Sequence, residues 1–208
     1  MTLDEYVELH SECESDALYQ INRRAHLQLI NPRMISGPMQ GRLLAMLCHM
    51  IQPKRIIELG TFAGYSAICM AEALAPDGVL HSIEYDDELE DFIRQNIALA
   101  GMSQKIVLHI GKALDIIPLM HDTFDLAFID ADKREYSAYF DALFPKIRKG
   151  GFILADNTLW DNKVLQAIEH NDAQTYAIDQ FNKKIAADPR VEKIILPLRD
   201  GISIIRKK

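Results

Sequence analysis

The chain has 208 residues, of which 49% are hydrophobic, enough for the core of one α/β domain of ordinary size. Its formal net charge of −7 argues against a broadly basic nucleic-acid-binding surface, although a local basic patch is compatible with it. The N-terminus lacks the basic start and apolar run of a signal peptide. The sequence contains no run of about 18 apolar residues, so no transmembrane helix is predicted. The three cysteines are widely spaced and odd in number, which favours reduced thiols in a cytoplasmic protein.

Two helical segments are predicted before the first strand. Apolar residues at helical spacing predict a helix over residues 3–30, ended by Asn31-Pro32, and a second helix that begins near Pro38. After Pro53, predicted strands and helices alternate, which indicates a parallel sheet with helices on both faces. The predicted strands are 54–59, 79–84, 105–110, 124–130 and 151–156, and the predicted helices are 64–75, 86–100, 113–119, 135–147 and a segment near 172–187.

The end of the chain departs from this alternation. Two apolar runs, 191–198 and 201–206, are joined by Arg199-Asp200 and predict a β-hairpin that closes the sheet. A parallel sheet that ends in an antiparallel strand differs from the sheet of dinucleotide-binding dehydrogenases. The hairpin therefore disfavours an NAD-dependent dehydrogenase.

The most informative motif follows the first predicted strand and reads Glu58-Leu59-Gly60-Thr61-Phe62-Ala63-Gly64-Tyr65-Ser66. A strand, a glycine turn and a helix present a nucleotide site at the carboxyl edge of an α/β sheet. The G-x-x-x-G spacing is neither the G-x-G-x-x-G of dinucleotide binders nor a P-loop. The charge of Glu58 would repel a pyrophosphate and attract a sulfonium or ammonium group, so the motif favours S-adenosylmethionine over NAD or ATP.

Glu84 ends the second predicted strand. An acidic side chain at that place can accept hydrogen bonds from both hydroxyls of a ribose. The alternative is a cap for the helix that begins at Asp86-Asp87. Because the glycine turn precedes it, we expect Glu84 to bind the ribose of the cofactor.

Polar side chains also end the fourth and fifth predicted strands. Asp130 follows one strand, and Asp156-Asn157 follow the other, so the three are expected to meet at the carboxyl edge of the sheet. For each residue alone, a turn or helix cap is the better explanation. Together they offer two carboxylates and an amide oxygen, hard ligands that suit Mg²⁺, Mn²⁺ or Ca²⁺.

Lys133 lies three residues after Asp130, on the same predicted turn. Beside a metal ion, it can act as a general base toward an acidic hydroxyl or orient the resulting anion. The alternative is a surface lysine paired with Asp132 or Glu135. Trp160 follows the proposed metal ligands closely and either walls a flat acceptor pocket or packs in the core.

These motifs, in this order, resemble those of the cation-dependent O-methyltransferases, which include caffeoyl-CoA and catechol O-methyltransferases and many small bacterial relatives. The resemblance covers the chain from about Leu18 to the C-terminus, including Pro197-Leu198-Arg199-Asp200-Gly201 in the hairpin. It implies a Rossmann-like methyltransferase fold, with a seven-stranded, mostly parallel sheet and a C-terminal antiparallel hairpin. We expect a single domain over residues 1–208, in which residues 1–52 form a helical extension that contributes to the acceptor site and to a homodimer.

The resemblance also implies roles for the residues that match the family's motifs. It assigns Lys133 as the base and, with it, Asp130 to the catalytic site, and it assigns Asp130, Asp156 and Asn157 as metal ligands. The residues that match cofactor contacts are Ser36, Glu58, Gly60, Thr61, Ser66, Glu84, Ala113 and Asp130. Two departures fall on the expected acceptor side and bear on the substrate: Gln40, where the family often has an acid, and Asn162, where it often has glycine.

The sequence thus predicts a divalent-metal-dependent transfer of a methyl group from S-adenosylmethionine to a hydroxyl of a catechol-like acceptor. The alternative acceptor is a tRNA with 5-hydroxyuridine at the wobble position, whose neighbouring oxygens can also chelate a metal. The acidic net charge argues against a large RNA footprint. A local basic region argues for a small footprint, and it consists of Arg23, Arg24, Arg33 and Arg42. The remaining alternative is a catalytically silent module that keeps the cofactor site.

Overall fold

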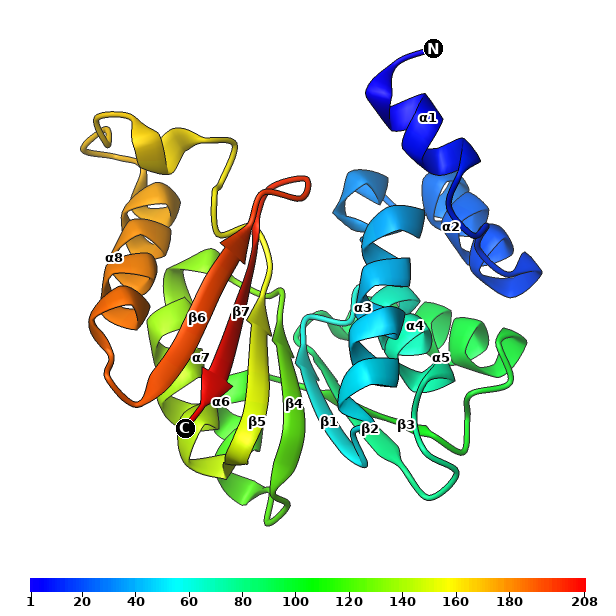
Figure 1. Ribbon diagram of the computed structural model, residues 1–208. Helices are drawn as coiled ribbons and strands as arrows, with labels where there is room; N and C mark the ends of the chain where they lie inside the picture. The colour runs from blue at the N-terminus through cyan, green and yellow to red at the C-terminus, as the bar shows by residue number, and fades with distance from the viewer.

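The computed structural model describes residues 1–208, with the side chains of Leu3, Asp4 and Glu8 outside the description, and its centre is a seven-stranded sheet (Figure 1). The strands are β1 (Arg55–Leu59), β2 (Val79–Glu84), β3 (Ile106–Ile110), β4 (Phe124–Ile129), β5 (Ile147–Ala155), β6 (Val191–Leu196) and β7 (Ile202–Lys207). Their order across the sheet is β3-β2-β1-β4-β5-β7-β6, and β7 runs antiparallel to both of its neighbours. The predicted fold, a mostly parallel sheet closed by a C-terminal hairpin, is confirmed.

Helices cover both faces of this sheet (Figure 1). One group is α2 (Asp16–Gln28), α3 (Gly37–Ile51), α4 (Tyr65–Glu72) and α5 (Glu90–Leu99), preceded by α1 (Leu3–Leu9). The other group is α6 (Ala113–Ile116), α7 (Tyr136–Leu143) and α8 (Ala173–Ala187). Short 3₁₀ helices are η1 (Pro32–Met34), η2 (Asp87–Leu89), η3 (Ile117–Leu119), η4 (Lys133–Glu135), η5 (Phe144–Lys146) and η6 (Lys163–Leu165).

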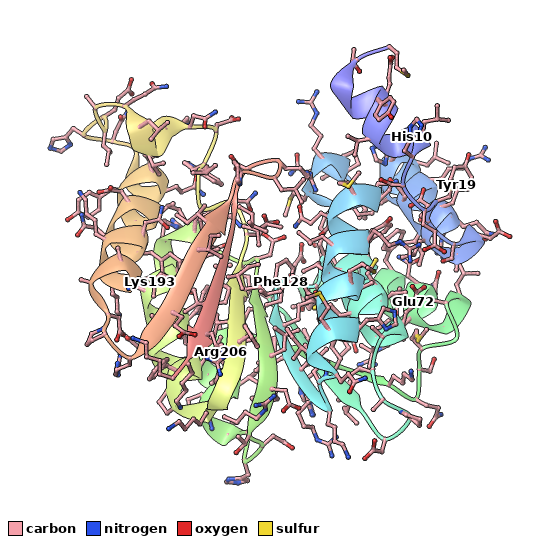
Figure 2. The ribbon with its side chains drawn as sticks, in the orientation of Figure 1. His10, Tyr19, Glu72, Phe128, Lys193 and Arg206 are labelled. Carbon is pink, nitrogen blue, oxygen red and sulfur yellow. The ribbon has the colours of Figure 1, made fainter. Side chains whose placement is uncertain are left out.

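Alternation along the strands divides the apolar side chains between two cores. Ile56 packs with α2, α3, α4 and α5, whereas its neighbour Ile57 packs with α6, α7 and α8. Phe128 of β4, labelled near the centre of Figure 2, is fully buried on the Ile56 side. Strands buried on both faces are typical of a parallel α/β sheet.

Several predicted boundaries differ from those of the structure. The helix predicted over 3–30 is broken after Leu9, and α2 begins afresh at Ser15, whose hydroxyl caps it by accepting from the backbone N–H of Leu18 at 3.4 Å. The helix predicted over 135–147 ends as α-helix at Leu143, because Pro145 cannot continue it. Strand β5 begins at Ile147 rather than at 151, and a register shift against β4 accommodates the additional residues.

The strand register brings four chain segments together at one edge of the sheet. Leu59 pairs with Ile83 and with Ile129, and Ile129 pairs with Ala155. The residues that follow continue this ladder: the N–H of Asp130 donates to Leu59 O and that of Asp156 donates to Ile129 O, both at 2.9 Å. The loop between β6 and β7 bends toward the beginning of α3 at this edge (Figure 1).

Among the described residues, no helix combines the length and the apolar composition needed to cross a lipid bilayer. Cys13, Cys48 and Cys69 are all free cysteines, the last two buried.

Candidate active site

A cavity of about 900 Å³ opens where the strands end. Its walls come from the glycine turn, the ends of β2, β4 and β5, the segment of η1 that leads into α3, and the β6–β7 loop. Ten of the predicted site residues line it: Ser36, Gly60, Thr61, Ser66, Glu84, Ala113, Asp130, Lys133, Asp156 and Asn157. Glu58 does not line the cavity.

The glycine turn lies directly against the end of β4. Gly60 has a φ of +92°, and a Cβ added there would overlap the carbonyl oxygen of Asp130. Glycine is therefore required both for the backbone conformation and for the close approach. Glu84 ties the turn down, because its carboxylate accepts from the N–H groups of Thr61 at 3.1 Å and Phe62 at 2.7 Å.

Glu58 lies beneath the cavity rather than in its wall. It is fully buried and accepts hydrogen bonds from the hydroxyls of Ser66, at 2.6 Å, and Ser82. Burial raises the pKa of Glu58 to about 8, although the two serine hydroxyls favour its charged form. Since Ser66 is part of the cavity wall, Glu58 acts on the cavity by fixing the Ser66 hydroxyl.

Asp130 and Asp156 come together at the ends of β4 and β5, as predicted. Oδ1 of Asp156 accepts from the backbone N–H of Asn157 at 2.8 Å, and Oδ2 accepts from Nε2 of Gln40 at 2.6 Å. Burial, and next the negative charge of Asp130, raise the pKa of Asp156 to about 6. Asn157 adopts a left-handed backbone conformation with φ of +54° and also lines the cavity.

This donor set fits a divalent cation. Two carboxylates that disfavour each other's charge would gain stability from a bound cation, and the amide oxygen of Asn157 would offer a third hard ligand. Within the described residues, no group of three His, Cys, Asp or Glu side chains is arranged to hold a metal ion. A metal site at this edge would therefore need the amide oxygen of Asn157 as well as the two carboxylates.

Lys133, the first residue of η4, lines the cavity at the same edge of the sheet. Its ammonium group is buried and donates to Oδ1 of Asp130 at 2.7 Å and to the hydroxyl of Tyr136 at 2.9 Å. The alternative of a surface ion pair is wrong, because Asp132 pairs with Arg134 and Glu135 accepts from the Tyr139 hydroxyl. Lys133 therefore faces the proposed metal ligands.

Two residues that hold the site residues in place, Tyr136 and Arg199, were not predicted from the sequence. Tyr136 donates to the backbone oxygen of Asp156 at 3.0 Å, and its position three residues after Lys133 was the available signal. Arg199 donates to Oε1 of Gln40 at 3.0 Å and to the carbonyl oxygens of Ile35 and Ser36. No signal in the sequence links Arg199 to Gln40, because the contact joins the hairpin to α3.

The remaining candidates divide between the cavity and other surfaces. Trp160 lines the cavity, and its buried indole N–H has no hydrogen-bond partner among the described residues. Of the four N-terminal arginines, Arg33 alone lines the cavity. Arg24 donates to Gln95 and Asn96, and Arg42 pairs with Glu12.

Comparison with known proteins gives a consistent result. A family model described as O-methyltransferase matches residues 8–208. A catechol O-methyltransferase of Niastella koreensis is 37% identical over 171 residues, 80% of this chain and 77% of the relative. A caffeoyl-CoA O-methyltransferase of Mesembryanthemum crystallinum is 36% identical over 185 residues, 84% and 73% of the two chains. The O-methyltransferase TomG of Streptomyces achromogenes, involved in tomaymycin synthesis and solved with SAM bound, superposes with a TM-score of 0.90 at 30% identity, covering 99% and 96% of the chains.

Proposed function

Because this chain belongs to the O-methyltransferase family, we propose that it moves a methyl group from S-adenosylmethionine to a hydroxyl of a catechol-like acceptor in a metal-dependent reaction. The enzyme class is that of its relatives and structural neighbours, which are O-methyltransferases. One observation carries the proposal: Asp130, Asp156, Asn157 and Lys133 line the same cavity as the glycine turn. We call the edge of the sheet at Asp130, Asp156 and Asn157 the acidic edge. A methyl donor on the glycine turn and an acceptor at the acidic edge would therefore meet.

The cofactor would be held by the turn and the strand ends. S-adenosylmethionine supplies an activated methyl group when it is bound. Gly60 and Thr61 would bring the backbone close to it, Ser36 and Ser66 would offer hydroxyls, and Glu84 would accept from the ribose hydroxyls. All five residues line the cavity. Ala113, after β3, would give a small apolar surface for the adenine, and Asp130, at the end of β4, would contact the cofactor.

The divalent cation would be held by Asp130, Asp156 and Asn157, with Mg²⁺ favoured and Mn²⁺ or Ca²⁺ compatible. When bound, it supplies a positive charge that lowers the pKa of a coordinated hydroxyl. Lys133, held by Asp130 and Tyr136, would receive the proton at its Nζ atom as a neutral amine, or would orient the resulting anion as an ammonium group. These side chains are buried or half-buried, so the site excludes much of the solvent from the reacting groups.

A small diol is favoured over tRNA as the acceptor. The relatives reported above are named for catechol and caffeoyl-CoA acceptors. Arg24 and Arg42 are engaged in contacts within the protein. If the acceptor were tRNA, binding would fall steeply with added salt, and Arg23→Ala with Arg24→Ala would reduce that dependence.

The chain would act as one methyltransferase domain over residues 1–208 and as a homodimer. Its N-terminal part, residues 1–52, contributes Arg33, Ser36 and Gln40 to the surroundings of the cavity and its edge. Size-exclusion chromatography with light scattering tests the dimer, and a mass of one chain would contradict it.

Labelled S-adenosylmethionine tests the reaction. The purified chain would be given a panel of catechols and, separately, undermodified bacterial tRNA, each with Mg²⁺ and with EDTA. We expect metal-dependent label on a catechol. Label on tRNA alone would show that the acceptor is tRNA rather than a catechol. Cofactor binding without methyl transfer to either pool would identify a silent cofactor-binding module.

A further inference from the structure

A positive charge next to the acidic edge has no carboxylate in contact with it. Arg199, on the loop between β6 and β7, makes no ion pair within the described residues, although it lines the cavity. Its guanidinium donates to two backbone carbonyl oxygens, of Ile35 and Ser36, and to the neutral amide oxygen of Gln40. These contacts hold the guanidinium in place without giving it a carboxylate partner.

Because residue 40 is a neutral glutamine, Arg199 has no carboxylate partner on α3. The amide of Gln40 is buried and bridges the two groups, accepting from Arg199 at 3.0 Å and donating to Asp156 at 2.6 Å. The guanidinium therefore lies one amide group away from a proposed metal ligand. The position often holds an acid in the family that the sequence resembles, and an acid there would neutralise Arg199.

The other cations around the cavity are differently placed. Lys133 and Arg134 are paired with Asp130 and Asp132. Lys112 follows β3, which is separated from β5 by three strands of the sheet. Arg33, on η1 before α3, is exposed, lines the cavity and has no ion pair within the described part of the chain. Arg199 and Arg33 are thus the unpaired cations on the wall formed by the β6–β7 loop and the start of α3.

We propose that the enzyme selects diols that carry a carboxylate on the ring, and that Arg199, assisted by Arg33, binds that carboxylate. The inference rests on the proposed diol O-methyltransferase function, because the diol oxygens must lie at the acidic edge. An arginine whose Nε has no partner among the described residues can donate to a carboxylate without losing a protein contact. A neutral diol of the same shape would leave the cation without a counter-charge.

A matched pair of acceptors tests this selectivity: 3,4-dihydroxybenzoate and its neutral amide, 3,4-dihydroxybenzamide. The values of kcat and KM would be measured for both with S-adenosylmethionine and Mg²⁺. We expect kcat/KM to be at least tenfold higher for the acid, mostly through a lower KM. If neither diol is methylated, the proposed acceptor and this inference both fail. If the two are methylated with equal kcat/KM, the inference alone fails.

Three variants locate the selectivity. Arg199→Gln removes the charge, and Gln40→Glu keeps Arg199 but neutralises it, so each should bring the ratio of the two kcat/KM values close to one. The ratio is informative even if a variant lowers activity on both acceptors, because a merely structural role would affect the acid and the amide alike. Arg206→Gln, on the same hairpin but paired with Glu192, is the matched control and should keep the ratio (Figure 2). An unchanged ratio in both Arg199→Gln and Gln40→Glu would overturn the assignment.

Discussion

Nε2 of Gln40 donates a 2.6 Å hydrogen bond to Oδ2 of Asp156, a residue 116 positions away in the chain. The bond ties α3 to the end of β5. It thereby connects the N-terminal helices to the edge of the sheet at which the reaction is proposed to occur. The surroundings of Asp156 therefore include a residue of the N-terminal helices.

Gln40→Leu should destabilise the protein, because it leaves a buried carboxylate oxygen without its donor. We expect a loss of about 1–3 kcal/mol in the free energy of unfolding, measured by urea denaturation. Gln28→Leu, at an exposed position near the end of α2, is the control and should change stability by less than about 0.5 kcal/mol. Equal effects of the two substitutions would show that the Gln40 contact contributes nothing.

Gly60→Ala should be far more damaging than the same change at another glycine with positive φ. At Gly60 the new methyl group overlaps the backbone of Asp130, whereas at Gly101, with φ of +70°, no atom lies within 4 Å of it. We expect Gly101→Ala to cost about 1–2 kcal/mol from backbone conformation alone. Gly60→Ala should exceed that loss and abolish S-adenosylmethionine binding in calorimetry. Normal cofactor affinity in Gly60→Ala would contradict the tight turn.

Glu58→Gln should change how stability depends on pH. Because burial raises the pKa of Glu58 to about 8, the native state resists its ionisation. The contribution of Glu58 to stability is therefore fully present below its unfolded-state pKa and is lost as pH rises through about 8. Relative to Glu58→Gln, the wild type should lose stability between pH 5 and pH 9, by on the order of 3–5 kcal/mol. Parallel pH profiles in urea denaturation without cofactor would refute a neutral buried Glu58.

Lys133→Met should reduce kcat while leaving the cofactor bound. If Lys133 receives or steers the proton, its loss should lower kcat by roughly 10²–10⁴-fold. The affinity for S-adenosylmethionine, measured by calorimetry, should change little, because the turn and Glu84 are untouched. Lys149→Met, an exposed lysine at the other end of β5, should keep full activity. A kcat within twofold of the wild type in Lys133→Met would remove Lys133 from the reaction.

Local patterns were sufficient to predict the sheet and ten of the residues that line the cavity. Strand ends of a parallel sheet meet at one edge, so Gly60, Glu84, Asp130 and Asp156 could be placed together from chain order alone. The side-chain direction of Glu58 could not be predicted. It depends on which face of β1 the side chain occupies and on the hydroxyls of Ser66 and Ser82, which donate to its carboxylate.

Contacts between distant segments were beyond prediction for a physical reason. The Gln40–Asp156 and Arg199–Gln40 hydrogen bonds depend on how the hairpin and α3 pack against the sheet, and no local periodicity encodes that packing. The break after Leu9 was missed because the apolar residues that predicted the helix lie after it, from Leu18 onward, while the Ser15 cap decides where α2 begins.

The metal-dependent transfer is tested most directly by the activity of Asp156→Asn on a catechol, beside the wild type, with Mg²⁺ and with EDTA. We expect the wild type to lose at least about a hundredfold of its kcat/KM in EDTA and to recover it with added Mg²⁺, because the metal would act on the acceptor in the transition state. With Mg²⁺ and with EDTA alike, Asp156→Asn should have the low kcat/KM of the wild type in EDTA. Asp161→Asn removes an exposed carboxylate in the loop after β5 and should behave as the wild type does. Full activity of Asp156→Asn in the presence of EDTA would contradict the proposed reaction.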